Sequence, residues 1–395
     1  MINEGEKPMP PKPMREFRKI YGDDGDIREY FAPGRVNLIG EHIDYNGGHV
    51  FPCALTVGTY LVARKRTDTI VNFYSANYKR GGVIARDLNS LSYDKSKAWT
   101  NYPFGVLWAI IQKGFPIKTG FDIYVYGNIP GSGLSSSASI EVAMGTMLQD
   151  MEKLPLSKQD IALISQKAEN EYNGCNCGIM DQFASAMASK KHALFLDCAT
   201  LQYENVPLEL KGVKIILANS NKPHSLVSSH YNDRRRECEE ALKLLQQKLP
   251  IKNLCELTPV EFEENKYLIQ DEILLKRAKH AVYEEYRTKE AVKALKENNI
   301  ERFAALINES GDSLHYDYDA TCFEIDTLVD EARSLPYVLG SRETGGGWGG
   351  NTISIVREDC VDQFIEHVSK AYKAKASLCA DFSVLEVGFG GRRIL

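Results

Sequence analysis

Residues 34–48 read Gly34-Arg35-Val36-Asn37-Leu38-Ile39-Gly40-Glu41-His42-Ile43-Asp44-Tyr45-Asn46-Gly47-Gly48. The apolar beginning of this run has the pattern of a short buried strand, and Glu41, His42 and Asp44 follow it within four positions. Burying an unpaired charge is costly, so such a cluster is not expected without a function. Carboxylates and an imidazole on a turn can accept several hydroxyl protons, as a site for a sugar or another polyol requires. The alternative interpretation is a solvated polar turn in which Arg35 pairs with Glu41.

A second unusual run, residues 127–139, reads Gly-Asn-Ile-Pro-Gly-Ser-Gly-Leu-Ser-Ser-Ser-Ala-Ser. Apolar residues alternate over 121–125, the period of a half-buried strand, and recur at helical spacing over 140–151. Glycines let backbone N–H groups turn inward, and the start of a helix adds partial positive charge, so this loop predicts a phosphate site. The loop lacks the Gly-Lys-Ser/Thr of a Walker A motif and the glycine spacing of a dinucleotide fingerprint. A flexible linker is the alternative.

A third run, Thr344-Gly345-Gly346-Gly347-Trp348-Gly349-Gly350, precedes a strand-like segment at 352–356. Five glycines in six positions indicate backbone conformations closed to other residues, or close approach to another group. A simple hairpin would need only one or two of them. The alternative is a glycine-rich β-bulge packed against the core.

Between the second and third runs, an apolar stripe predicts a helix that ends at Glu169, and Asp181 begins another helix. An Asp in the first turn of a helix is usually a cap or a favourable partner of the helix dipole. The Cys175-Asn176-Cys177 sequence has no second Cys/His pair at ligand spacing, which argues against a zinc site.

The three glycine runs, in this order, resemble the three motifs of the GHMP small-molecule kinases. Residues 34–48 look like the signature of the galactokinases in that family, and the resemblance extends from Phe31 to Leu395. It implies a two-lobed α+β fold of mixed sheets and helices with the active site between the lobes. The blocks of strand and helix also suit α+β better than regular βαβ alternation. We expect an N-terminal GHMP kinase domain at 1–210 and a C-terminal one at 211–395.

The resemblance implies ATP-dependent phosphorylation of the anomeric hydroxyl of D-galactose, by direct in-line transfer, to galactose 1-phosphate and ADP. Asp181 would act as base or orienting acceptor, and Arg35 would hold Asp181 ionised and stabilise charge on the migrating phosphoryl group. The residues implied to bind the sugar are Glu41, His42, Asp44, Gly178, Tyr231 and Gly346. Those implied to bind ATP are Trp99, near the adenine, and Gly131, Ser132, Gly133, Leu134, Ser135, Ser136 and Ser137. Ser137 and Glu169 would coordinate Mg²⁺.

Three positions depart from the galactokinase pattern. Ile43 replaces the usual Thr, and we expect it on the core side of its turn. Trp348 stands where Phe is usual and Asn351 where a small residue is common, and both could alter the pocket volume or the accepted sugar. Two alternative functions stay open: a non-catalytic galactose sensor, and a kinase for another substrate such as N-acetylgalactosamine or a non-sugar alcohol. The serine-rich stretch 135–139 (Ser-Ser-Ser-Ala-Ser) is intact, and with Arg35 and Asp181 both present it argues against the sensor.

Composition excludes other classes of function. The net charge of −5 gives no basic field for nucleic acid, and we expect the Arg234-Arg235-Arg236 cluster to be a solvated or salt-bridged helix face. The nine cysteines are scattered along the chain, and we expect them to be reduced thiols. No apolar stretch reaches membrane-spanning length. We therefore expect a cytoplasmic protein, monomeric, with no membrane partner.

The coarse pattern also predicts where the regular elements lie. A short helix is expected within residues 1–27, and further helices at 101–113, 225–249 and 258–310. The expected strands are 28–39, 49–64, 69–76, 213–218, 352–356 and 383–388.

Overall fold

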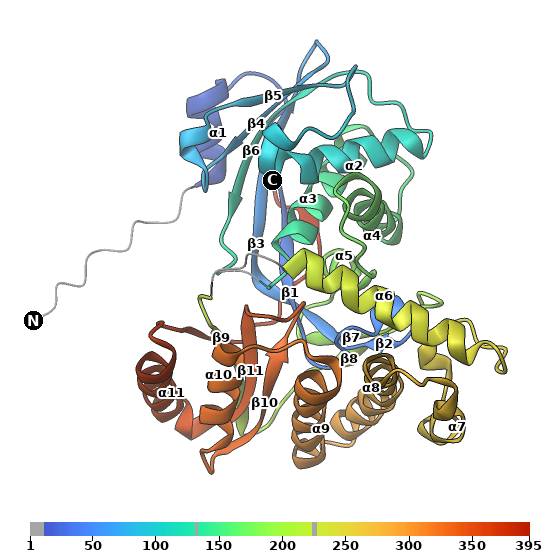
Figure 1. Cartoon of the computed structure of the whole chain (residues 1–395). Helices are drawn as coiled ribbons and strands as arrows, with labels where there is room; N and C mark the ends of the chain where they lie inside the picture. The colour runs from blue at the N-terminus through green and yellow to red at the C-terminus, as the bar shows by residue number, and fades with distance from the viewer. Residues whose placement is uncertain (1–11, 131–132, 223–226) are drawn as a thin grey trace, which may run out of the picture.

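The computed structural model describes residues 12–130, 133–222 and 227–395. The chain forms two lobes, the N-terminal one at the top of Figure 1 and the C-terminal one below it. Each lobe has its own mixed layers of sheet and helix, so the expected α+β fold is confirmed. Among the described residues, none of the helices is both long and apolar enough to cross a membrane.

A six-stranded sheet forms the N-terminal lobe, in the order β13-β1-β3-β6-β4-β5. Its strands are β1 (Arg28–Asn37), β3 (Pro52–Lys65), β4 (Ile70–Ser75), β5 (Ile84–Asp87), β6 (Phe121–Gly127) and β13 (Arg392–Arg393). Successive side chains of a strand face opposite sides. On β3, Leu61 and Ala63 therefore join the main core while Val62 packs against Phe17. That Phe17 comes from α1 (Pro13–Tyr21), and the other face holds α2 (Asn101–Gln112), α3 (Ser136–Met151), α4 (Lys158–Lys167) and α5 (Met180–Met187).

A four-stranded sheet, in the order β10-β11-β9-β12, forms the C-terminal lobe. Its strands are β9 (Val213–Asn219), β10 (Val338–Thr344), β11 (Asn351–Arg357) and β12 (Asp381–Val384). The helices of this lobe are α6 (Val227–Leu245), α7 (Pro259–Asn265), α8 (Glu272–Lys296), α9 (Ile300–Ser313), α10 (Phe323–Arg333) and α11 (Val361–Ala376). On one side α10 and α11 cover this sheet, and α9 packs on the other (Figure 1). A small sheet of β2 (His49–Val50), β7 (His192–Asp197) and β8 (Tyr203–Pro207) completes the strands.

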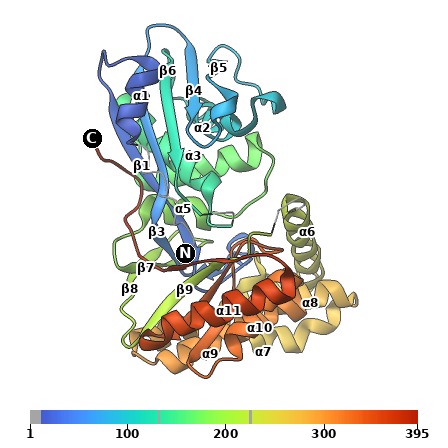
Figure 2. The same ribbon diagram turned by 90° about the vertical axis from the view of Figure 1, so that its left-hand side faces the viewer.

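The C-terminal segment differs from the expectation. The strand expected at 383–388 ends at Val384, and Val387 forms only an isolated bridge with Leu55. The chain then returns to the N-terminal lobe, where β13 pairs with β1 and the C-terminus lies (Figure 2). A single cut in the sequence thus does not separate the lobes in space, and the limits 1–210 and 211–395 stay predictions.

Candidate active site

The three glycine runs meet where the lobes face each other. A Cβ atom added to Gly345 would lie 2.8 Å from the carbonyl oxygen of Gly133, and one added to Gly34 would lie 2.6 Å from that of Leu134. Gly345 also has a φ of +101°, which favours glycine. The missing side chains allow backbone from β1, the serine-rich loop and the β10–β11 hairpin to pack together. The third run is thus a hairpin connection that makes a close approach.

Arg35 and Asp181 form a two-point ion pair at this meeting place. Arg35 follows a register shift in β1, and its Nε and Nη2 atoms donate to the two Asp181 carboxylate oxygens at 2.8 Å each. Asp181, in the first turn of α5, also accepts a hydrogen bond from the Ser135 hydroxyl at 2.5 Å. The Arg35 side chain is 5% exposed and that of Asp181 28%. The carboxylate is thus held firmly but remains open to a substrate.

Glu41 is buried and paired with a residue of the other lobe. Its side chain and that of Arg342 have no exposed surface and lie 2.6 Å apart. The backbone N–H of Gly345 donates to the same carboxylate at 3.1 Å. Burial raises the pKa of Glu41, and the Arg342 charge lowers it again. The alternative of a solvated turn with an Arg35–Glu41 pair is therefore wrong, because Arg35 pairs with Asp181 and Glu41 with Arg342.

A cavity of about 120 Å³ opens beside Asp181. It is lined by Arg35, His42, Asp44, Glu169, Cys175, Cys177, Gly178, Met180, Asp181, Tyr231, Gly345 and Gly346. Burial lowers the pKa of His42 to about 3, so its ring is neutral at pH 7. Burial, and then the Asp181 charge, raise the pKa of Asp44 to about 6. Of the sugar-binding residues expected from the sequence, only Glu41 is absent from this lining, and its contact with a sugar stays a prediction.

The geometry explains why position 178 is a glycine. An added Cβ atom would lie 2.1 Å from Oδ2 of Asp44, closer than atoms can pack. The residue thus leaves room for the Asp44 carboxylate at the cavity wall.

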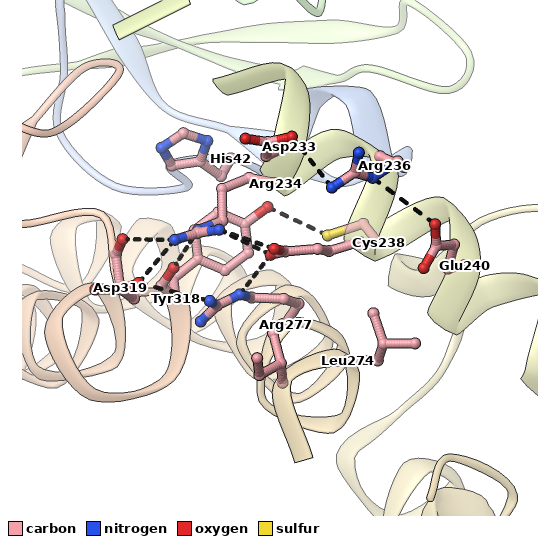
Figure 3. A network of polar contacts seen from close by, with 12 residues as sticks. His42, Asp233, Arg234, Arg236, Cys238, Glu240, Leu274, Arg277, Tyr318 and Asp319 are labelled. Carbon is pink, nitrogen blue, oxygen red and sulfur yellow. Dashed lines mark hydrogen bonds and ion pairs between the residues drawn. The ribbon is translucent and has the colours of Figure 1, made fainter. Parts of the chain in front are cut away.

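A network of polar contacts lies next to His42, one of the residues that line this cavity (Figure 3). Arg234 of α6 donates to the Tyr318 carbonyl oxygen at 2.8 Å and pairs with the Asp319 carboxylate at 2.8 Å. The ring of Tyr318 packs against that of His42, with centroids 4.8 Å apart. Arg234 is only 7% exposed, so the expectation of a solvated face is wrong for this residue. Its planar guanidinium satisfies several acceptors at once, which a surface position would not require.

The other two arginines of that cluster behave as expected. Arg235 pairs with Glu239 at 3.0 Å, and Arg236, 63% exposed, pairs with Asp233 at 3.1 Å. Both pairs lie within α6, and Arg235 also donates to the Asn176 carbonyl oxygen at 2.8 Å, so Arg234 is the buried residue of the cluster.

The three departures from the family pattern lie outside the cavity lining. Ile43 is fully buried, as expected. Trp348 packs its ring against His42, with centroids 5.9 Å apart, and donates from Nε1 to the Asp319 carbonyl oxygen at 3.1 Å. Asn351 lies near Gly133, where an added Cβ atom would meet its Nδ2 atom at 3.2 Å. Trp348 therefore contacts the cavity indirectly, through the His42 ring and through His230, which precedes the cavity-lining Tyr231 and packs 5.3 Å from the Trp348 ring.

A larger cavity of about 400 Å³ lies in the N-terminal lobe next to the serine-rich loop. Its lining includes three residues expected to bind ATP, namely Trp99, Ser136 and Ser137, together with the exposed Tyr78. The Leu134 side chain is buried in the core, so only its backbone could contact a nucleotide. Gly131 and Ser132 lie outside the described residues.

Of the expected metal ligands, Ser137 lines this larger cavity and Glu169 lines the smaller one. Glu169 lies in a π-helical turn (Ala168–Tyr172), a distortion frequently found at functional sites, and its carboxylate accepts a hydrogen bond from Gln182 Nε2 at 2.8 Å. Burial raises the pKa of Glu169 to about 7. Neighbouring Glu141 is also fully buried, and neither of its carboxylate oxygens has a hydrogen-bond partner among the described residues.

This acidic pair fits Mg²⁺. No lysine or arginine of the described chain forms an ion pair with either carboxylate, although two buried acids side by side favour a cation. Within the described ranges no three His, Cys, Asp or Glu side chains are grouped to hold a metal. Mg²⁺ usually takes one or two carboxylates and completes its coordination with phosphate and water.

Some residues of the site escaped the sequence analysis. Cys175 and Cys177 line the smaller cavity. From the sequence they had been considered only as zinc ligands. The Cys177 thiol donates to Asn170 Oδ1 at 3.2 Å. Glu141 lies four positions after Ser137 on α3, and this helical spacing could have pointed to it. The Glu41–Arg342 pair joins residues about 300 positions apart, and no local pattern signals it.

Comparison with known proteins agrees with this architecture. The sequence-family model for the N-terminal domain of GHMP kinases matches residues 101–189, and the family model for their C-terminal domain matches residues 291–374. A Methanococcus jannaschii mevalonate kinase, 17% identical, has the same fold with a TM-score of 0.61 over 92% of this chain and 99% of that one. The chain is thus a GHMP kinase in fold.

More specific matches follow from the first motif and the whole sequence. The galactokinase galactose-binding signature matches residues 15–65. A galactokinase of Lactiplantibacillus plantarum is 49% identical over 96% of this chain and 98% of its own, and one of Clostridium beijerinckii is 50% identical over 96% and 97%. A Lactococcus lactis galactokinase solved in complex with galactose superposes with a TM-score of 0.94, at 43% identity over 96% and 98% of the two chains. The chain belongs to the galactokinase family.

Proposed function

We propose that this chain transfers the terminal phosphoryl group of ATP to the anomeric hydroxyl of D-galactose, giving galactose 1-phosphate and ADP. The Arg35–Asp181 pair carries this assignment, because a half-open carboxylate is fixed between a small polar cavity and a larger one that contains Trp99 and Ser137. The two substrates would then meet at Asp181. Phosphoryl transfer requires mainly positioning and charge stabilisation from a protein, and the site offers both.

Each group near the reacting atoms has a distinct part in this mechanism. Asp181 accepts the hydrogen of the sugar hydroxyl and aligns its oxygen for attack, while Ser135 and Arg35 fix the carboxylate. The Arg35 guanidinium also stabilises negative charge that develops on the migrating group. Mg²⁺, held by Ser137 and Glu169, would neutralise phosphate charge when the nucleotide is bound.

Sugar recognition rests on groups whose charge state is set by burial. Asp44, with a pKa of about 6, is mostly ionised at pH 7 and accepts hydroxyl protons. Neutral His42 has an Nε2 atom without a partner among the described residues, available to a hydroxyl group. Tyr231 packs its ring 5.3 Å from that of His42 and closes the cavity from α6. Discrimination between sugar epimers follows, because a buried polar group left unpaired costs about 1–3 kcal/mol.

A substrate panel tests the proposal. ADP release is measured with ATP and Mg²⁺ and with galactose, N-acetylgalactosamine, glucose, arabinose or mevalonate. Rapid turnover with galactose and little with glucose is expected. Galactose binding without ADP release would identify a sensor instead, and preferred turnover of N-acetylgalactosamine would reassign the sugar.

Metal dependence and assembly need separate measurements. Turnover should stop on chelation of divalent ions and return with excess Mg²⁺. A monomer in the cytoplasm stays our expectation, to be checked by light scattering of the purified chain and by cell fractionation.

A further inference from the structure

A third polar cavity, of about 140 Å³, lies in the C-terminal lobe away from both substrate cavities. The end of α9, the π-helical turn after it (Leu314–Tyr318), α10 and β10 enclose it. Its lining is strongly acidic and includes Asp312, Asp326, Asp330 and Glu343. Two arginines, Arg333 and Arg342, also contribute to the wall.

Neither arginine neutralises the whole lining. Arg333 pairs with Asp312 at 2.5 Å and donates to the Ser341 carbonyl oxygen at 2.9 Å. Arg342 points to the opposite side of β10, where it pairs with Glu41. Asp326 contacts the His315 ring at 3.1 Å, and that ring also contacts the Thr321 hydroxyl at 2.9 Å. The acidic groups therefore outnumber the cations that face them.

Glu343 is the most informative residue of the cavity. Its side chain comes from β10 and is 2% exposed, yet neither carboxylate oxygen has a hydrogen-bond partner within the part of the chain that the structure describes. Burial raises its pKa, the Glu41 and Asp326 charges raise it further, and the Arg342 charge opposes them. A buried acid without any partner is costly in either protonation state, so a missing ligand is a direct explanation.

We propose that this cavity binds a small monovalent cation such as potassium, held by the carboxylates of Glu343 and Asp326, the Thr321 hydroxyl and water. A cavity of about 140 Å³ has room for an ion and a few waters, each of which takes about 30 Å³ in the liquid.

The position of Glu343 connects the cation to the sugar cavity. Gly345, two residues further along, lines that cavity and donates to Glu41. Oε1 of Glu343 also lies 3.1 Å from the position that a Cβ atom on Gly347 would take, so the carboxylate packs against the glycine hairpin. Neutralising this carboxylate would stabilise the hairpin. This inference does not depend on which sugar is phosphorylated.

Thermal unfolding of the full chain without substrates tests the site. The melting temperature is compared in potassium, sodium and tetramethylammonium chloride at equal ionic strength. For a site occupied at about ten times its dissociation constant, potassium should raise the melting temperature by roughly 1–3 °C over tetramethylammonium. Glu343→Gln keeps the shape of the side chain and should abolish this difference. Glu366→Gln, an exposed glutamate of α11, is the matched control and should retain it.

A direct measurement uses the wild-type protein and does not depend on a variant folding. Crystals soaked in rubidium chloride should show an anomalous peak beside Glu343. The proposal is overturned if no peak appears there, if the melting temperature is the same in all three salts, or if Glu343→Gln keeps the potassium effect of the wild type.

Discussion

The two substrate cavities of this kinase are built on different principles. The cavity of about 120 Å³ is bounded by charged groups that are already locked together, such as Arg35 with Asp181. The cavity of about 400 Å³ is bounded in part by aromatic side chains with few fixed partners, among them Tyr78, which is 64% exposed. The smaller cavity is thus preorganised, and the larger one can adapt to its ligand.

The difference teaches where specificity and turnover should reside. Buried charges act strongly because little water screens them, and they penalise a ligand that leaves them unpaired. Aromatic stacking is weaker and tolerant of the exact ring placed on it. Changes at the smaller cavity should therefore affect catalysis, folding and sugar choice, whereas changes at the larger one should mainly shift the concentration of ATP required.

The largest effect is expected at Asp181, which lines the smaller cavity and accepts a hydrogen bond from Ser135, next to Ser136 of the larger one. Asp181→Asn keeps the side-chain shape and an acceptor for Arg35 but removes the negative charge that receives the hydroxyl proton. General-base groups contribute about 10²–10⁴-fold, so kcat should fall by roughly 10³-fold in an ADP-release assay. A kcat within a few-fold of the wild type would refute the role of this residue.

Folding should survive that substitution, because the amide oxygen still accepts a hydrogen bond from Arg35, which also donates to the Gly133 carbonyl oxygen at 3.0 Å. The melting temperature, measured alongside kcat, distinguishes lost chemistry from lost structure. Ser135→Ala is the matched control. It removes only one hydrogen bond to the same carboxylate and should reduce kcat far less.

The next largest effect is expected on stability, and it tests whether the groups around the smaller cavity are preorganised. Arg342→Met leaves the Glu41 carboxylate buried without its cation, which should lower the free energy of unfolding by about 3–5 kcal/mol in a urea titration. Adding Glu41→Gln to the same chain should recover part of that loss. Equal stability of the single variant and the wild type would mean that the pair does not hold the lobes together.

How far the site could be foreseen depends on the range of the interactions involved. Local runs pointed to Arg35 and Asp181, and the structure brings them together. Hydrophobic periodicity placed most strands of the N-terminal sheet, since it records which side chains face the core. The prediction that Arg234 lies on a solvated face was wrong. In the sequence, an arginine with acidic neighbours at helical spacing has the same pattern on a surface as in a buried network. The Arg342–Glu41 pairing depends on the packing of two lobes, which no local pattern contains.

A moderate effect is expected for Asp44, which tests charge in the smaller cavity by pH. The folded protein raises its pKa from 3.8 to about 6 and so holds the proton more tightly than the unfolded chain. Its contribution to stability is then full below about pH 4 and is lost as the pH rises to about 6. Galactose binding should improve over the same rise, because the ionised carboxylate accepts hydroxyl protons.

Asp44→Asn removes this titration and provides the measurement. Its galactose KM at pH 7 should rise by roughly 5- to 100-fold, the equivalent of a lost buried hydrogen bond to a charged group, while the KM for ATP stays unchanged. Between pH 5 and 7 the variant should also show a flatter galactose KM than the wild type. A raised KM for ATP with an unaltered KM for galactose would show that Asp44 contacts the nucleotide and not the sugar.

The smallest effect is expected in the larger cavity, where Trp99→Ala removes an aromatic wall. Stacking beyond simple burial is worth about 0.5–1.5 kcal/mol, so the KM for ATP should rise by roughly 2- to 12-fold with little change in kcat or in the galactose KM. Tyr286→Ala, an exposed aromatic of α8, controls for the loss of a ring elsewhere. A loss of turnover as large as that of Asp181→Asn would break the comparison, because it would show that the adaptable cavity also sets the geometry of the reacting groups.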